Sequence, residues 1–106
     1  MTGITRGSGN VFADIGVPDP ETHLVKAELV RRIGLIIESD GLSQAEAAER
    51  LGLSQPDVSK MLNGQFRPMS LERLLRCLVA LGQTVTIDVA TPKSKTKRPE
   101  LRVSAR

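Results

Sequence analysis

Apolar residues recur at spacings of three and four along two long stretches of the chain, a period typical of helices that bury one face. The first helix is expected from Pro20 to about Ser39, capped by Asp19, with an apolar face made of Leu29, Val30, Ile33, Ile36 and Ile37. The last helix is expected to start after Ser70 and to end at Gly82, with a buried face made of Leu71, Leu74, Leu75, Leu78 and Val79.

Two shorter helices are expected between these, and local capping signals bound both of them. Ser43 followed three residues later by Glu46 forms a capping box, and Ser54 followed by Asp57 repeats that spacing. Gly52 separates the two, as expected where a helix ends in a left-handed conformation. The pattern therefore predicts two short helices joined by a tight turn at Gly52.

Small side chains in the first short helix indicate that the second one crosses close over it. Ala45, Ala48 and Leu51 share one face, with Ala47 on its flank. The second short helix is expected to turn an apolar face toward them, made of Val58, Met61 and Leu62. Two short helices packed across a tight turn form a helix-turn-helix.

A strand is predicted after the last helix, over residues 84–90, because apolar and polar residues alternate there. A single strand leaves its backbone donors and acceptors unpaired, so it needs a partner. The partner could be a short extended piece near Val11 of the same chain or the same strand of a second chain. We favour the second option, a two-fold dimer whose expected interface is made of Leu78, Leu81, Val85, Ile87 and Val89.

The positive charge of the chain is concentrated at its end. Residues 93–106 hold six of the fifteen Lys and Arg and one of the twelve Asp and Glu, so the remainder holds nine and eleven and has a net charge of −2. We therefore divide the 106 residues into a flexible segment (1–17), one folded domain (18–91) and a basic, disordered tail (92–106). The tail could strengthen contact with a polyanion through counterion release, or it could be only a solvated end.

The sequence offers little for an enzyme. Its one histidine, His23, stands alone on an expected surface helix and is best interpreted as a solvated polar residue. Its one cysteine, Cys77, lies beside the buried face of the last helix and is better explained by packing than by nucleophilic catalysis. We expect no catalytic residues, no metal and no cofactor. With no signal peptide or membrane span expected either, the predicted location is the cytoplasm, in association with the nucleoid.

A helix-turn-helix places the N-terminal end of its second helix in the major groove of DNA. Gln55 can pair with adenine, Lys60 can donate to guanine or phosphate, and Ser59 can bond to either. Arg67, in the loop after this helix, is placed to hold the DNA backbone. For Asp57, a capping role is favoured over accepting a hydrogen bond from cytosine. The predicted DNA-binding set is Gln44, Ser54, Gln55, Pro56, Asp57, Ser59, Lys60, Asn63, Gln65 and Arg67.

Residues 42–66, LSQAEAAERLGLSQPDVSKMLNGQF, resemble the lambda-repressor-like helix-turn-helix of the xenobiotic-response-element (XRE) family. With GNVFADIGVPDPET before them and SLERLLRCLVALGQTVTIDV after, the chain over residues 9–90 is similar to small HigA-like antitoxins. The resemblance implies an all-α domain of four to five helices with one C-terminal β-strand. It also implies a homodimer that binds the promoter of its own operon and neutralises a toxin, typically a ribonuclease.

Two other functions stay open at this point. The chain could be a stand-alone regulator without a toxin, since such regulators share the same architecture. It could also be a protein-interaction module, because the body of the chain is net acidic. Binding to DNA should weaken steeply with salt, whereas an apolar protein interface should not, so salt dependence separates the two classes.

Overall fold

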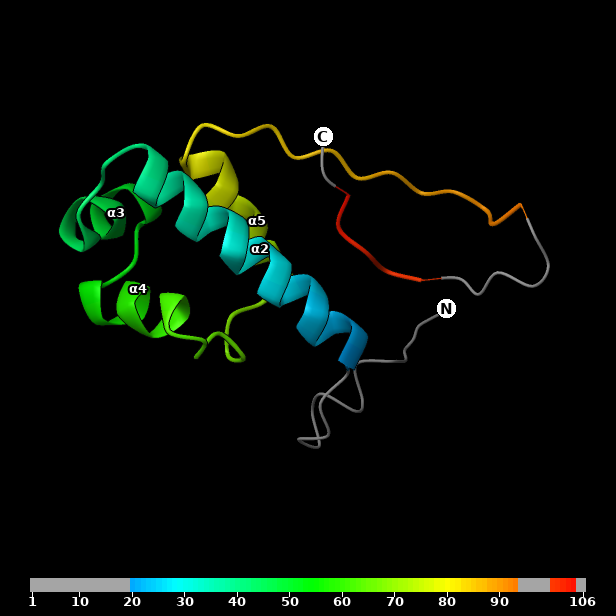
Figure 1. Ribbon diagram of the computed structural model, residues 1–106, viewed down its shortest axis with the longest axis horizontal. Helices are drawn as coiled ribbons and strands as arrows, with labels where there is room; N and C mark the ends of the chain where they lie inside the picture. Colours follow the sequence, from blue (N-terminus) through cyan, green and yellow to red (C-terminus); the bar gives the residue numbers. More distant parts are fainter. Residues whose placement is uncertain (1–19, 94–99, 105–106) are drawn as a thin grey trace.

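The computed structural model describes residues 20–93 and 100–104, and it contains four helices in that part of the chain (Figure 1). These are α2 (Pro20–Ser39), α3 (Gln44–Leu51), α4 (Gln55–Leu62) and α5 (Leu71–Ala80). The prediction of an all-α helical domain is confirmed for these residues. The extended piece expected near Val11 lies outside them.

The long helix α2 is the spine of the domain. It packs against α5 along one side and against α4, while α3 packs against α4 and α5. In Figure 1, α3 and α4 gather at the end of α2 where its chain leads into them. All four helices send a fully buried side chain into one core, represented by Ile33, Ala47, Met61 and Leu74. Removal of this apolar surface from water is the main force that holds the helices together.

The expected inward faces are correct for α2 and α4 but shifted in the other two helices. In α3, Ala47 and Ala48 are buried and Ala45 is exposed. In α5, Cys77 faces the core, whereas Val79 is 56% exposed. The sequence pattern of α5 has more apolar residues than one face can bury, and packing against α2 and α3 selects the positions that are buried.

The predicted C-terminal strand is not present among the described residues. Residues 83–92 have no regular secondary structure, and Figure 1 shows them leaving α5 as a drawn-out segment that runs beyond the helices. The alternation of apolar residues favours an extended backbone, but a strand is completed only by hydrogen bonds to a neighbouring strand. No neighbouring strand lies beside residues 83–92 in the described part of the single chain.

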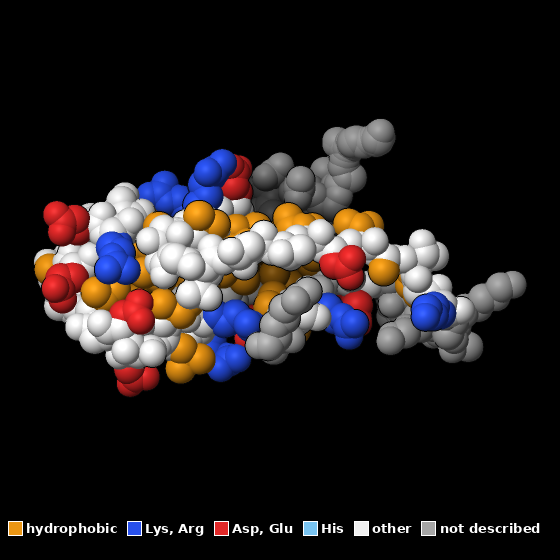
Figure 2. Space-filling view, turned by 90° about the horizontal axis from the view of Figure 1, so that it is seen from above, with side chains coloured by type: hydrophobic (Ala, Val, Ile, Leu, Met, Phe, Trp, Pro, Cys, Tyr) orange, Lys and Arg blue, Asp and Glu red, His pale blue; other side chains and the backbone are white. Residues whose placement is uncertain are grey.

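Residues of the expected dimer interface fall into two groups. Leu78 and Leu81 are only 6% and 4% exposed, because they belong to the core of their own chain. Ile87 and Val89 are 75% and 90% exposed on the segment that follows. Figure 2 looks onto the side along which this segment runs and shows hydrophobic side chains gathered around it and beneath it.

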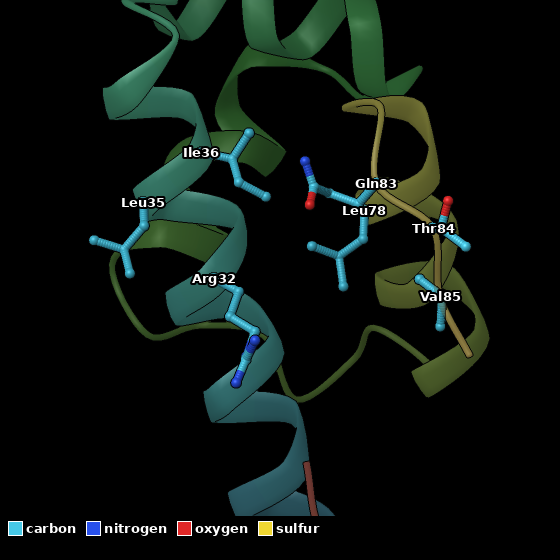
Figure 3. A pocket seen from close by; sticks show the side chains of 7 residues that line it. All are labelled: Arg32, Leu35, Ile36, Leu78, Gln83, Thr84 and Val85. Carbon is cyan, nitrogen blue, oxygen red and sulfur yellow. The ribbon is translucent and has the colours of Figure 1, made fainter. Parts of the chain in front are cut away.

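Val85 lies between these groups, half-buried at a groove between α2 and the start of the segment (Figure 3). The groove has a volume of about 270 Å³ and is lined by Arg32, Leu35, Ile36, Leu78, Gln83, Thr84 and Val85. Leu35 remains about half exposed at its edge. Exposed apolar side chains therefore lie both at this groove, with Leu35, and along the segment that follows it, with Ile87 and Val89.

The described end of the tail returns to α2. Leu101 and Val103 line a shallow hollow with Leu24 and Val25, near the start of that helix, and Val103 is half-buried against the core. The disorder expected of the whole tail stays a prediction for its other residues.

Candidate nucleic-acid interface

Hydrogen bonds within a few residues fix both ends of α3. The Ser43 hydroxyl accepts from the Glu46 N–H at 3.1 Å, and the Glu46 carboxylate accepts from the Ser43 N–H at 2.8 Å, so the predicted capping box is formed. Gly52 has a φ of 68°, and the Leu53 N–H donates to the Ala48 carbonyl at 3.0 Å. A residue with a Cβ is strained at that φ, which explains the glycine at the turn.

The start of α4 is fixed in a similar way. The Ser54 hydroxyl accepts from the Asp57 N–H at 3.1 Å, and Pro56 occupies the first turn, where no donor is needed. Small, buried Ala47 and Ala48 on α3 leave room for α4, whose Val58 is fully buried. The packing therefore holds α4 close to α3 with its first turn free of other helices.

The outward face of α4 is polar and accessible. Gln55, Asp57, Lys60 and Asn63 are exposed, and so are Gln44, Ser54, Pro56, Gln65 and Arg67 from the predicted set. Ser59 is half-buried, and its hydroxyl accepts a long 3.4 Å hydrogen bond from the Asn63 amide. Nine of the ten predicted residues are thus exposed, Gln44 at the start of α3 and the others on α4 or in the segments directly before and after it.

The side chain of Asp57 was expected to cap α4, but it does not. Its main-chain N–H donates to Ser54, but the described residues provide no partner for its carboxylate. Glu46, at the equivalent position of α3, has the additional carbon that lets its carboxylate reach back to the N–H of Ser43. The shorter Asp57 side chain leaves its charge on the outward face, where it can accept a hydrogen bond from a base.

The positive charges of this face are not neutralised within the protein. Among the described residues, Lys60 and Arg67 form no ion pair, while Arg31 and Arg32 both bind Glu28 on α2, at 2.8 and 2.9 Å. The hydrogen bond from Arg31 lowers the pKa of Glu28. Lys60 and Arg67 therefore remain available for phosphate or base acceptors.

The loop after α4 is held by three residues outside the predicted DNA-binding set, Phe66, His23 and Lys26. Phe66 is buried, and its ring stacks on that of His23 with centroids 5.2 Å apart and planes 18° from parallel. The Lys26 ammonium donates to the Arg67 carbonyl at 3.2 Å. The interpretation of His23 as a solvated residue is wrong, since it is half-buried against Phe66. The signal available in the sequence was the spacing of three between His23 and Lys26, which places them on one side of α2.

The described residues show no group of three or more His, Cys, Asp or Glu side chains that could hold a metal ion. Cys77 is buried, and desolvation raises the pKa of its thiol, which agrees with a packing role. None of the helices has the length and apolar character needed to cross a membrane, within the residues searched.

The family described as "Helix-turn-helix domain" matches residues 11–90 of the chain. The chain belongs to this helix-turn-helix family. One solved structure, described as a "Putative XRE Family Transcriptional Regulator", is 38% identical and superposes with a TM-score of 0.73, covering 83% of this chain and 97% of that one. Among the curated proteins, none matches this chain. In this helix-turn-helix protein the two helices of the motif are α3 and α4, and α4 takes the position of the recognition helix.

Proposed function

We propose that the protein is a sequence-specific, double-stranded DNA-binding regulator of transcription, acting as a repressor. The observation that carries the proposal is the exposed outward face of α4, where the side chains of Gln55, Asp57 and Lys60 form no hydrogen bond or ion pair with the described residues. The XRE name of the structural relative supports the same function.

The chemistry of the face suits base edges and phosphates together. The Gln55 amide can pair with adenine N6 and N7, Lys60 can donate to guanine, and the Asp57 carboxylate can accept from a cytosine amine. Arg67 beside them would bind the phosphate backbone, with Gln44 and Ser54 at the two helix N-termini. Phosphate contacts would fix the position of α4, and its side chains would select the sequence.

We further propose that the regulator is a homodimer formed through residues 84–90. The support is the segment itself, whose Ile87 and Val89 are exposed and whose backbone has no strand partner in the described part of the chain. Pairing with the same segment of a second chain would satisfy the backbone and cover these side chains. A two-fold dimer would present two α4 helices to half-sites about one helical turn apart.

An antitoxin role is a finer proposal, supported by the HigA-like pattern of residues 9–90. In this proposal the protein represses its own operon and neutralises a ribonuclease toxin encoded beside it. The alternative is a stand-alone regulator without a toxin. Co-expression with the neighbouring gene tests the difference, because a stable complex that blocks ribonuclease activity would support the antitoxin and its absence would favour the stand-alone regulator.

The DNA-binding proposal is tested by fluorescence anisotropy with DNA from just upstream of the gene, with a scrambled duplex as control, across a salt series. We expect tighter binding to the native sequence, which Gln55→Ala or Lys60→Ala should weaken by about 1–3 kcal/mol for a direct contact. Arg76→Ala, which removes an exposed charge on α5, is the matched control. Equal, weak and salt-sensitive binding to both duplexes would instead favour a protein-interaction module.

The dimer is tested by the mass of the protein in solution. Ile87→Asp and Val89→Asp should convert the dimer to a monomer and weaken binding to a two-half-site duplex more than to a single half-site. Thr86→Asp, one position before Ile87 and on the opposite side of an extended backbone, is the matched control. A monomeric wild-type protein would contradict the proposed dimer and leave the DNA-binding face untouched.

A further inference from the structure

Two side chains of α2 hold the loop that leads from α4 to α5. His23 and Lys26 are separated by three positions, so they lie on the same side of the helix. His23 stacks on Phe66, and Lys26 donates to the backbone of the next residue, Arg67. The contact from Lys26 spans 41 positions of sequence, so it is a tertiary contact between the spine of the domain and the end of the helix-turn-helix.

The stacking fixes one point of the loop. Phe66 is buried in the core between exposed neighbours, Gln65 and Arg67. Its carbonyl also accepts from the Met69 N–H at 3.0 Å, which closes a turn. Because both the ring and the carbonyl of Phe66 are held, the part of the loop next to α4 has little conformational freedom.

The hydrogen bond from Lys26 fixes a second point, one residue further along. Lys26 is half-buried, and its ammonium reaches the Arg67 carbonyl at 3.2 Å. The hydrogen bond from α2 therefore restrains the peptide group that follows Arg67. The Arg67 side chain is exposed and has no carboxylate partner among the described residues. Because the backbone of Arg67 is restrained, its exposed side chain samples fewer conformations before it binds a phosphate group.

We propose that His23 and Lys26 are positioning residues for DNA binding, which hold the loop so that the Arg67 guanidinium meets the phosphate backbone beside α4. This inference rests on the proposed DNA-binding function. The two residues do not touch DNA themselves; they lower the entropy that Arg67 loses when it binds. The contribution appears in DNA affinity rather than in base selection, because phosphate contacts carry no sequence information directly.

A double-mutant cycle between Lys26 and Arg67 tests the inference. Lys26→Met keeps the aliphatic stem and removes the donor, and Lys26→Arg restores a donor. We expect Lys26→Met to weaken binding to the native upstream duplex about 2- to 10-fold, the scale of ordering one long side chain. Lys26→Arg should recover most of this loss. In an Arg67→Ala background, Lys26→Met should cause no further loss.

The salt dependence of the same complexes separates positioning from direct contact. Arg67→Ala should reduce the slope of log K against log salt by about one, the value for one phosphate contact. Independent losses from Lys26→Met and Arg67→Ala, each with its own reduction in slope, would overturn the inference and place Lys26 on the DNA. An unchanged affinity for Lys26→Met, or for Arg67→Ala, would overturn it as well.

The stacking is tested with His23→Ala and His23→Phe. His23→Phe keeps an aromatic ring against Phe66 and should bind DNA as the wild type does, whereas His23→Ala should weaken binding without changing the preferred sequence. Leu24→Ala, an exposed position next in the chain, is the matched control. Thermal melts of all variants check the fold, and a loss of affinity that follows melting temperature across the set would overturn the positioning role.

Failure of this inference is distinguishable from failure of the proposed function. If the wild-type protein does not prefer its upstream duplex, the DNA-binding function itself fails. If it does prefer that duplex but the cycle is additive, the function stands and only the positioning role of His23 and Lys26 is rejected.

Discussion

Gly34 in α2 faces Leu62 in α4, and a methyl group added at Gly34 would lie 3.5 Å from Leu62 Cδ2, an ordinary van der Waals distance. A glycine inside a helix costs about 0.5–1 kcal/mol relative to alanine. Gly34→Ala should therefore raise the free energy of unfolding by about 0.5–1 kcal/mol, measured by urea denaturation, and should leave DNA affinity unchanged.

Larger side chains at Gly34 provide the contrasting case. Gly34→Leu would place several further carbons where Leu62 lies and would push α4 away from α2, at a cost of about 1–3 kcal/mol. Since α4 is the recognition helix in the proposed function, DNA affinity should fall together with stability. If Gly34→Ala were as destabilising as Gly34→Leu, the two helices would be closer than the structure shows.

Ala47 and Ala45 form a matched pair for testing how α3 and α4 pack. Ala47 is completely buried, whereas Ala45 is exposed two positions earlier in the same helix. Ala47→Leu should destabilise the protein by about 1–3 kcal/mol through overpacking and should weaken DNA binding. Ala45→Leu should change stability little, because its side chain points into solvent. Equal effects of the two substitutions on the urea midpoint would contradict the helix orientation.

Glu46 should make stability depend on pH through the capping box. Hydrogen bonding from Ser43 lowers the pKa of this carboxyl below its ordinary value of 4.5. A folded-state pKa below the unfolded one stabilises the protein at pH values above 4.5, and this contribution is lost as the pH falls through the lowered value. Glu46→Gln can still accept the hydrogen bond from the Ser43 N–H but cannot titrate.

The measurement for Glu46 is the free energy of unfolding of both proteins between pH 7 and pH 3. The advantage of the wild type should shrink below pH 4.5, where Glu46 takes up a proton. The pKa of Glu28 is also lowered, by Arg31 and Arg32, but Glu28 is present in both proteins and cancels in the difference. A difference that is constant across this range would contradict the role of the charged carboxylate.

The helix ends were predictable from sequence because capping is local. Ser43, Ser54 and Ser70 each accept from the N–H three residues later, as the serine spacings predict. For the short helix α3, the sequence pattern predicted that alanines face the core, but not which alanines are buried. In α3, the choice between Ala45 and Ala47 depends on where α4 and α5 lie, and no local pattern contains that information.

Long-range contacts account for the remaining differences between prediction and structure. The pairing of His23 with Phe66 joins residues on separate elements, so neither residue signals it alone. For residues 84–90, alternation favours an extended backbone, but the strand depends on a second backbone that the described part of one chain does not supply. A single sequence predicts structure that depends on residues close together in the chain. It does not predict contacts that depend on a distant segment or on another molecule.

The basic tail should add a non-specific term to DNA binding. Residues 93–106 carry a net charge of +5, against −2 for the rest of the chain. Deleting them should reduce the slope of log K against log salt by about 0.9 for each phosphate that the tail neutralises, and should leave the preferred DNA sequence unchanged. The measurement is anisotropy with the native and scrambled duplexes across the salt series.

Deletion also removes Leu101 and Val103, which lie against the start of α2, so a charge variant is needed beside it. Replacing Lys93, Lys95, Lys97 and Arg98 by glutamine keeps the apolar residues and removes most of the charge. The glutamine variant should reproduce the weaker salt dependence while keeping the melting temperature of the full chain. An unchanged salt slope in both variants would mean that the tail is a solvated end, and that Lys60, Arg67 and the helix N-termini provide the phosphate contacts.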